Sequence, residues 1–400
     1  MKKFLEYVDI DPRTYLEKGE VYDYVEMKQV EPFTRKPSIV VKKKYIGQGC
    51  VFREGDILLA RITPSLEHGK VIFVKKLDTK VGFGSTEFFV LRTKNKKIGQ
   101  LYLYYFCFGP IFRETLINSM VGASGRQRVN KGVFYDYEFD PPPLPIQRKI
   151  ASILSAYDDL IELNERRIKI LEEMARLIYK EWFVKFKFPG YEKVKMVESE
   201  LGMIPEGWEV RSILDIEGVN LIKAKVKRYN GVKEYFATAN IEGNNIIKNG
   251  EMVTYDERPS RAQMQPEENT IWFAKMRETY KVLCFTSANK EKAERSILSS
   301  GFAGLKADKD IFGFAYFTVN SKEFHNQKDQ FCTGATQMSS TIEGLSLIKI
   351  VLPDKNLVKE YSELTQPIID QIIRLQQQNS ILRQTRDMLL PKLISGEIDV

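Results

Sequence analysis

The chain has 400 residues, of which 43% are hydrophobic and 28% are charged. It is too long for one ordinary core and too apolar for a disordered protein, so we expect two folded domains. No apolar run reaches the ~18 residues of a membrane helix, and Glu6 interrupts the start before a signal-peptide core could form. We therefore expect no membrane segment and a cytoplasmic location.

The net charge of +8 is concentrated in the first half of the chain. Residues 1–143 carry about +7, whereas residues 191–352 are about neutral. Such an excess favours a polyanionic partner, such as DNA or RNA, through phosphate contacts and counterion release.

The sequence is built twice, with a period of about 210 residues. The strand-like run GDILLARI at 55–62 has its counterpart in NTIWFAKM at 269–276, and both end in Ala, a cation and an apolar residue. Later, GASGRQ at 122–127 resembles GATQ at 334–337. We predict a duplication of whole mixed α/β domains, each followed by a helical segment.

The two helical segments, 144–188 and 353–400, each begin at a Leu-Pro pair and carry a coiled-coil-like apolar stripe. The positions predicted to pack helix on helix are Ile150, Ile153, Tyr157, Leu160, Leu171, Met174, Ile178 and Trp182 in the first, and Tyr361, Leu364, Ile368, Ile372, Leu375 and Leu382 in the second. Asn164 and Asn379 fall on these stripes, where they either fix the register or are surface residues. The predicted domains are 1–143 and 189–352, the latter including a linker.

Methyltransferase chemistry has no clear sequence support in this chain. Asp140-Pro141-Pro142-Pro143 resembles the Asp/Asn-Pro-Pro-aromatic loop of adenine methyltransferases, but a proline replaces the aromatic residue that stacks on the flipped base. A glycine-rich cofactor loop and a Gly-Lys-Ser/Thr phosphate loop are also missing from the sequence.

Metal or nucleophile chemistry is equally weakly supported. The group Asp23, Glu26 and Lys28 is spaced too tightly for a convincing nuclease site, and the second half has no matching set. His68 and His325 lie in dissimilar surroundings, so we expect structural or surface roles. We also expect reduced, mostly buried thiols without a zinc or redox motif, at Cys50, Cys107, Cys284 and Cys332.

The segments LPIQRKIASIL at 144–154 and IELNE at 161–165 resemble the central conserved region of type I restriction-modification specificity subunits. The segments WFVKFKFPG at 182–190 and LGMIPEGWE at 201–209 resemble that family's passage into its second recognition domain. The resemblance implies two target-recognition domains separated by two long antiparallel helices, each domain reading half of a split DNA target. Residues 352–355 depart from the family's usual helix start.

The resemblance also implies partners. Two methyltransferase subunits would dock on the helices and recognition domains, and restriction subunits would supply a motor and nuclease. The chain itself would be non-catalytic and without a cofactor, and S-adenosylmethionine, ATP and Mg would belong to the partner subunits. The alternatives are a duplicated DNA-binding scaffold or regulator without enzyme partners, and a DNA-modifying enzyme with an unrecognised active site.

Several side chains are candidates for contact with double-stranded DNA, because Arg and Gln can read purine edges and Lys can hold phosphate. The candidates in the first half are Arg61, Arg126, Gln127, Arg128 and Lys131. The candidates in the second half are Lys275, Arg277, Thr336, Gln337, Lys223, Lys225, Lys227 and Arg228. A solvated basic loop is the alternative for these residues, and an exposed strand face is the alternative for the alternating lysines.

Overall fold

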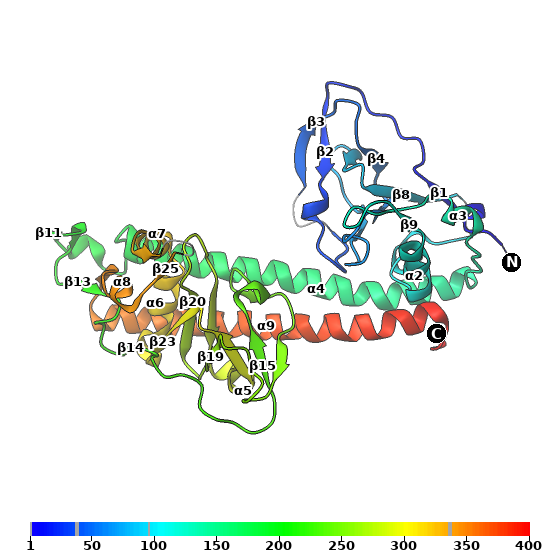
Figure 1. Cartoon of the computed structure of the whole chain (residues 1–400). Coiled ribbons are helices and arrows are strands. Elements are labelled where there is room, and N and C mark those ends of the chain that lie inside the picture. The colour runs from blue at the N-terminus through cyan, green and yellow to red at the C-terminus, as the bar shows by residue number, and fades with distance from the viewer. Residues whose placement is uncertain (1, 37–39, 95–96, 335–337) are drawn as a thin grey trace. The chain divides into compact units, whose positions relative to one another are not determined.

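The computed structural model describes residues 2–36, 40–94, 97–334 and 338–400. The chain divides into two compact units, each with strands, short helices and part of two long helices (Figure 1). The first unit consists of Met1–Leu163 and Asn379–Val400, and the second of Asn164–Gln378. The predicted fold class, two mixed α/β domains with two long helices, is confirmed.

Two four-stranded sheets lie in the described part of the first unit. Their strands are β1 (Val8–Ile10), β2 (Val21–Val25), β3 (Val41–Lys44), β4 (Cys50–Arg53), β5 (Ile57–Ala60), β6 (Val71–Phe73), β7 (Val81–Gly84) and β8 (Phe88–Thr93). One sheet is antiparallel, in the order β1-β8-β5-β6, and the other has the order β3-β2-β7-β4 with β2 and β7 parallel. β5 is an unbroken apolar run because both of its faces are covered: Ile57 and Leu59 join one hydrophobic cluster and Leu58 joins another.

Short helices and a hairpin complete the first unit. They are the 3-10 turns at Phe4–Glu6 and Met27–Gln29, the helices α1 (Gln100–Phe106), α2 (Pro110–Asn118) and α3 (Val133–Asp136), and the hairpin strands β9 (Met120–Val121) and β10 (Arg128–Val129). The buried ring of Phe4 lies 5.4 Å from that of Phe112 and 5.3 Å from that of Phe139. This aromatic packing holds the start of the chain against α2 and the segment that leads into the first long helix.

The two large sheets of the second unit repeat this arrangement. Their strands are β14 (Val219–Leu221), β15 (Lys233–Phe236), β18 (Glu251–Val253), β19 (Ala262–Met264), β20 (Thr270–Ala274), β21 (Val282–Phe285), β22 (Ser296–Ser299) and β23 (Phe302–Ala307). The order β14-β23-β20-β21 matches β1-β8-β5-β6, and β18-β15-β22-β19 matches β3-β2-β7-β4, including a parallel pair of β15 with β22. β20 lies within residues 269–276, which the sequence comparison aligned with the residues of β5. The two halves of the chain therefore repeat the same fold.

The long helices are α4 (Leu144–Tyr179), which ends in a π-helical turn at Lys180–Val184, and α9 (Lys355–Ser395). The start of α9 is where the sequence departs from the family pattern. Oδ1 of Asp354 there accepts hydrogen bonds from the backbone N of Asn356 at 3.0 Å and of Leu357 at 3.1 Å. This cap satisfies amides that a helix start leaves free, so α9 begins without the usual residues.

Within each unit the two long helices run antiparallel. In the first unit Arg386 bonds Asp158, and Asn379 donates to the backbone O of Ile161 at 3.4 Å. In the second unit Nδ2 of Asn164 donates to Oε1 of Gln378 at 3.1 Å, and Oη of Tyr361 donates to the backbone O of Ala175 at 3.2 Å. Asn164 and Asn379 are both buried, so neither is a surface residue.

The apolar stripe predicted on the helices is wrong at Ile153, Met174 and Leu364, which are exposed. On α4 the buried positions fall one residue later, at Leu154 and Ala175. The displacement arises because the buried stripe includes the charged Asp158 and the small Ala175, which hydrophobicity alone does not select. The other predicted packing residues are buried at Ile150, Tyr361, Ile372 and Leu375 and half-buried at Tyr157, Leu160, Leu171, Ile178, Trp182, Ile368 and Leu382.

Smaller elements complete the second unit. They are β11 (Met196–Ser199), β12 (Gly202–Pro205), β13 (Glu209–Ser212), β16 (Ile241–Glu242), β17 (Asn245–Ile246), β24 (Cys332–Thr333), β25 (Ser339–Ser340), β26 (Lys349–Leu352), α5 (Lys290–Arg295), α6 (Lys309–Val319), α7 (Lys322–Gln330), α8 (Ile342–Ser346), and 3-10 turns at Tyr191–Lys193, Thr238–Asn240 and Ser287–Asn289. α6 packs closely on α9 at Gly313, where a Cβ atom would lie 2.3 Å from Oγ1 of Thr365. A glycine is therefore required at this helix contact.

Candidate nucleic-acid interface

The glycine loop of the first unit is the tip of the β9–β10 hairpin. Gly122 and Gly125 have φ values of 126° and 78°, which a side chain would strain. The hairpin is attached to the end of β5: Ile62 forms a β-bridge with Arg128, and the backbone N of Val129 donates to the O of Arg61 at 2.8 Å. The fold thus brings together two candidates, Arg61 and the hairpin, that are far apart in the sequence.

The cations of this hairpin differ in how they are neutralised. Arg128 donates to Glu87 through Nη2 at 2.7 Å and Nε at 2.9 Å, and Nζ of Lys131 lies 2.8 Å from Asp11. Arg126 is exposed and makes no ion pair among the described residues. Gln127 is held through its backbone, which exchanges hydrogen bonds with Thr63 at 3.0 and 3.1 Å. The side chains of Arg126 and Gln127 are therefore the most available for a ligand.

Arg61 lies half-buried in a cleft of about 320 Å³. Its guanidinium stacks 4.5 Å from the ring centre of Phe89, and its buried Nε has no hydrogen-bond partner in the described structure. Arg13, Thr14 and Thr86 also line the cleft. A buried donor without an acceptor is costly, so the cleft is suited to a ligand with an acceptor group.

Lys275 occupies the equivalent position in the second unit. The second hairpin consists of β24 and β25. The backbone N of Ser340 in β25 donates to the O of Lys275 at 2.9 Å, and Met276 forms a bridge with Ser339. Burial lowers the pKa of Lys275, whose side chain is half-buried. Each unit therefore presents a half-buried cation at the end of its central strand, under its hairpin.

The second hairpin has a different charge environment from the first. The position of Glu87, whose backbone O bonds the N of Arg61, is taken by Gly301, whose O bonds the N of Lys275 at 2.9 Å. Arg277 is exposed, and its Nη1 lies 3.3 Å from Sδ of Met338. The candidates Thr336 and Gln337 lie outside the described residues.

The lysine cluster of the second unit lies in a loop after β14 and not on a strand. Lys223, Lys225 and Lys227 are all exposed, and Arg228 lies 3.1 Å from Asp256. The alternating spacing therefore does not describe a strand face here.

Sequence reasoning missed a second basic surface, on the edge strand β3. All four residues of β3 are exposed, including Lys42, Lys43 and Lys44. Nζ of Lys43 lies 4.2 Å from the ring centre of Tyr24, a cation–π distance. The signal is the run of three lysines itself, which a count of net charge does not distinguish from scattered cations.

Asp23 and His325, two of the residues weighed for metal or base chemistry, are buried, whereas His68 is exposed. Nζ of Lys42 and the backbone N of Asp78 bond the carboxylate of Asp23 at 2.8 and 2.7 Å; these bonds outweigh burial and lower its pKa. Burial lowers the pKa of His325 to about 4, so the ring is neutral at pH 7.

Within the described ranges, no three His, Cys, Asp or Glu side chains are grouped to hold a metal ion. The helices in these ranges also include none with the length and apolar character that a membrane span needs.

Comparison with known proteins gives a consistent result. A family model described as "Type I restriction modification DNA specificity domain" matches residues 9–173. The specificity subunit of the type I restriction enzyme MjaIX from Methanocaldococcus jannaschii is 26% identical over 357 residues, which cover 88% of this chain and 79% of that protein. The EcoAI specificity subunit from Escherichia coli is 34% identical over 142 residues, 34% of this chain and 23% of that protein.

A solved structure shows the same fold. The S subunit of a type I restriction-modification system from M. genitalium matches with a TM-score of 0.57 and 14% identity, over 98% of this chain and 95% of that chain. Residues 9–173 thus resemble a type I DNA specificity domain, and the chain as a whole has the fold of that S subunit. The resemblance predicted from the sequence is thereby confirmed: the chain is similar to type I restriction enzyme specificity subunits.

Proposed function

We propose that the chain recognises a bipartite DNA target and directs methyltransferase and restriction subunits to it, without catalysis of its own. The observation that carries this proposal is the repeated geometry around Arg61 and Lys275, in which each unit places a half-buried cation where a β-hairpin joins its central strand. Two such sites suit two half-sites, because Arg and Lys donate to guanine edges or to phosphates.

The same proposal gives roles to the flanking cations. Arg126, Gln127 and Arg277 would contact base edges or phosphates at the hairpins, and the lysines at 223, 225 and 227 would hold phosphates of the second half-site. Arg128 and Lys131 already have carboxylate partners, so their contribution to DNA binding would be smaller.

An exposed apolar side of α4 supports a protein partner. In the second unit Ile170, Met174 and Leu177 are exposed at spacings of four and three residues, which places them on one side of the helix. An exposed apolar stripe of this kind is typical of a docking surface. We assign it to methyltransferase subunits, which would bring S-adenosylmethionine, while restriction subunits would bring ATP and Mg.

Methylation mapping tests this function directly. The chain coexpressed with its methyltransferase subunit should modify one split sequence of two fixed half-sites, whereas the purified chain alone should neither methylate nor cut DNA. Turnover by the isolated chain would favour a DNA-modifying enzyme, and copurification of no methyltransferase would favour a scaffold or regulator.

Replacing Arg126 by Ala is expected to weaken DNA binding by ~1–3 kcal/mol with loss of discrimination at one base if the guanidinium reads a base, or to reduce the salt slope by ~1 if it holds a phosphate. Arg128→Ala should have a smaller effect, because Glu87 already neutralises that guanidinium. Lys28→Ala removes an equal charge from an exposed pair with Glu26 and is the control. Titration of labelled duplex at several salt concentrations measures the DNA affinity and its salt dependence. If both are unchanged in Arg126→Ala, the hairpin is not part of the interface.

A further inference from the structure

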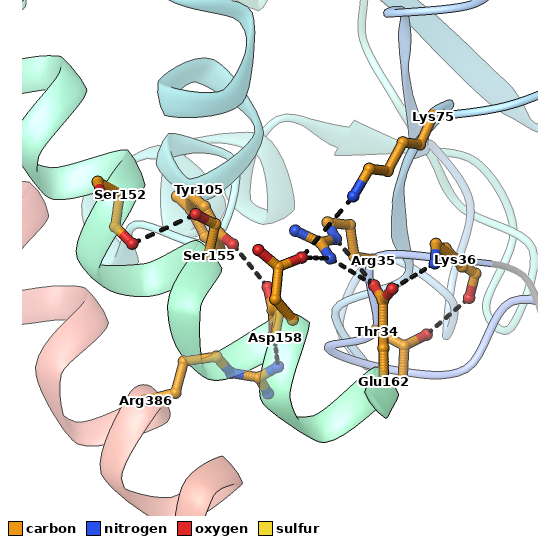
Figure 2. A network of polar contacts seen from close by, with 11 residues as sticks. Thr34, Arg35, Lys36, Lys75, Tyr105, Ser152, Ser155, Asp158, Glu162 and Arg386 are labelled. Carbon is orange, nitrogen blue, oxygen red and sulfur yellow. Dashed lines mark hydrogen bonds and ion pairs between the residues drawn. The ribbon is translucent and has the colours of Figure 1, made fainter. Parts of the chain in front are cut away.

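One turn of α4 in the first unit carries three acidic residues that bind three other parts of that unit. They are Asp158, Asp159 and Glu162. Figure 2 labels Asp158 and Glu162 together with the cations that approach this turn. None of these acids was selected from the sequence, because the groups that bind them lie more than 50 residues away along the chain.

Arg35 connects the sheets to this turn. Its side chain is 3% exposed; Nε and Nη2 donate to Oε1 of Glu162 at 2.9 and 2.7 Å, and Nη2 donates to Oδ1 of Asp159 at 2.5 Å. Burial acts to lower the pKa of Arg35, but the bonds to the two carboxylates outweigh it and raise the pKa. On its other side the backbone O of Arg35 accepts a hydrogen bond from the N of Phe73 in β6 at 3.1 Å. Arg35 thus connects a sheet directly to α4 through hydrogen bonds.

The neighbouring Asp158 binds two helices. Oη of Tyr105 in α1 donates to its Oδ2 at 2.6 Å, and Nη1 of Arg386 in α9 donates to its Oδ1 at 2.5 Å. The side chains of Asp158 and Arg386 are 5% and 7% exposed. One turn of α4 is therefore fixed to a sheet, to α1 and to α9 by charge-assisted hydrogen bonds.

The charges in this cluster balance. The cations Arg35, Lys36, Lys75 and Arg386 face the anions Asp158, Asp159, Glu162 and Asp387. Buried ion pairs are poor evidence for stability, since apolar residues of similar size often serve as well. A guanidinium that bridges two carboxylates has a fixed bonding geometry. It therefore opposes rotation or sliding of the sheet relative to α4, which an apolar contact would permit.

We infer that Arg35, with Asp159 and Glu162, is a positioning residue that fixes the angle between the first recognition domain and α4, and thereby the number of base pairs between the half-sites. The inference rests on the proposed function. It predicts that replacing Arg35 weakens the preference for one number of base pairs between the half-sites and leaves the bases read at each half-site unchanged.

The test uses the full chain in complex with its methyltransferase subunit, and duplexes in which the mapped half-sites are separated by the native gap or by one or two base pairs more or fewer. Arg35→Met should lower the preference for the native gap about tenfold, equivalent to ~1.4 kcal/mol. Arg35→Lys should lower it similarly, because a point charge cannot bridge two carboxylates in a fixed geometry. Lys28→Met, which breaks an exposed pair in the same unit, is the matched control.

A triple variant, R35M/D159N/E162Q, removes the acids together with the cation, so that it leaves no unpaired buried carboxylate if Arg35→Met alone does not fold. An unchanged gap preference in this folded variant would overturn the inference, as would altered base identity at the first half-site, since that would make Arg35 a reading residue. Failure of the proposed function is distinguishable: the wild-type complex would then show no bipartite pattern at all.

Discussion

Insertion of four helical residues into both α4 and α9 is expected to lengthen the gap between the two recognised half-sites by nearly two base pairs. Four residues add ~6 Å at ~1.5 Å per residue and rotate the remainder of each helix by about 40°. Base pairs of DNA are ~3.4 Å apart, so the added length spans almost two of them. The bases within each half-site should stay the same, because neither hairpin is altered.

The structure indicates where the insertions belong. Glu172, about two turns before the end of α4, is half-buried, so a single insertion there would shift the stripe that packs on α9. Matched insertions after Leu163 and after Gln378 fall at the boundary between the two units. The same four residues inserted after the exposed Leu201, in the β11–β12 turn, are the control and should leave the gap unchanged. The expectation that the length of the two helices sets the gap is tested by methylation mapping. An active double-insertion complex that kept its gap or changed its recognised bases would contradict it.

Replacement of Arg386 by Met is expected to destabilise the first unit by ~3–5 kcal/mol, because it leaves the buried carboxylate of Asp158 without its cation. The double variant D158N/R386M should recover most of this loss, since the stranded charge is then gone. Arg176→Met removes an arginine from an exposed pair with Glu173 and should cost less than ~1 kcal/mol.

Urea unfolding followed by hydrogen exchange in α1 would measure this effect, since Tyr105 of α1 also bonds Asp158. Equal losses in the single and double variants would show that the cost lies in packing around Arg386 and not in the unpaired charge. A loss no larger than that of Arg176→Met would show that the pair adds no stability to the unit.

The sequence was sufficient for features that depend on local pattern. The apolar runs of β5 and β20 identified the repeat, because a strand buried on both faces needs an unbroken run. The positions of Arg61 and Lys275 followed from that alignment. Periodicity also located both long helices, although the start of α9 depends on the cap at Asp354.

The errors and omissions involve partners that are distant in sequence. Asp158 occupies a core position only because Arg386 and Tyr105 satisfy it, so a hydrophobic pattern passes it over and selects Ile153. Arg35 could not be distinguished from other basic loop residues, since its carboxylates lie on α4, more than 120 residues away. The availability of Arg126 and the neutralisation of Arg128 likewise depend on where the fold places Glu87.

The division of the chain has a consequence for its synthesis. The first unit needs residues from the end of α9, because its core includes Leu390 and Leu393 and its Asp158 pairs with Arg386. The second unit is formed from one continuous stretch, 164–378. Domains generally fold in order as they leave the ribosome, the N-terminal one first. Here completion follows the opposite order, because the first unit needs helical turns that are synthesised after the whole of the second unit. A nascent chain halted before residue 379 therefore holds all residues of the second unit but lacks part of the first.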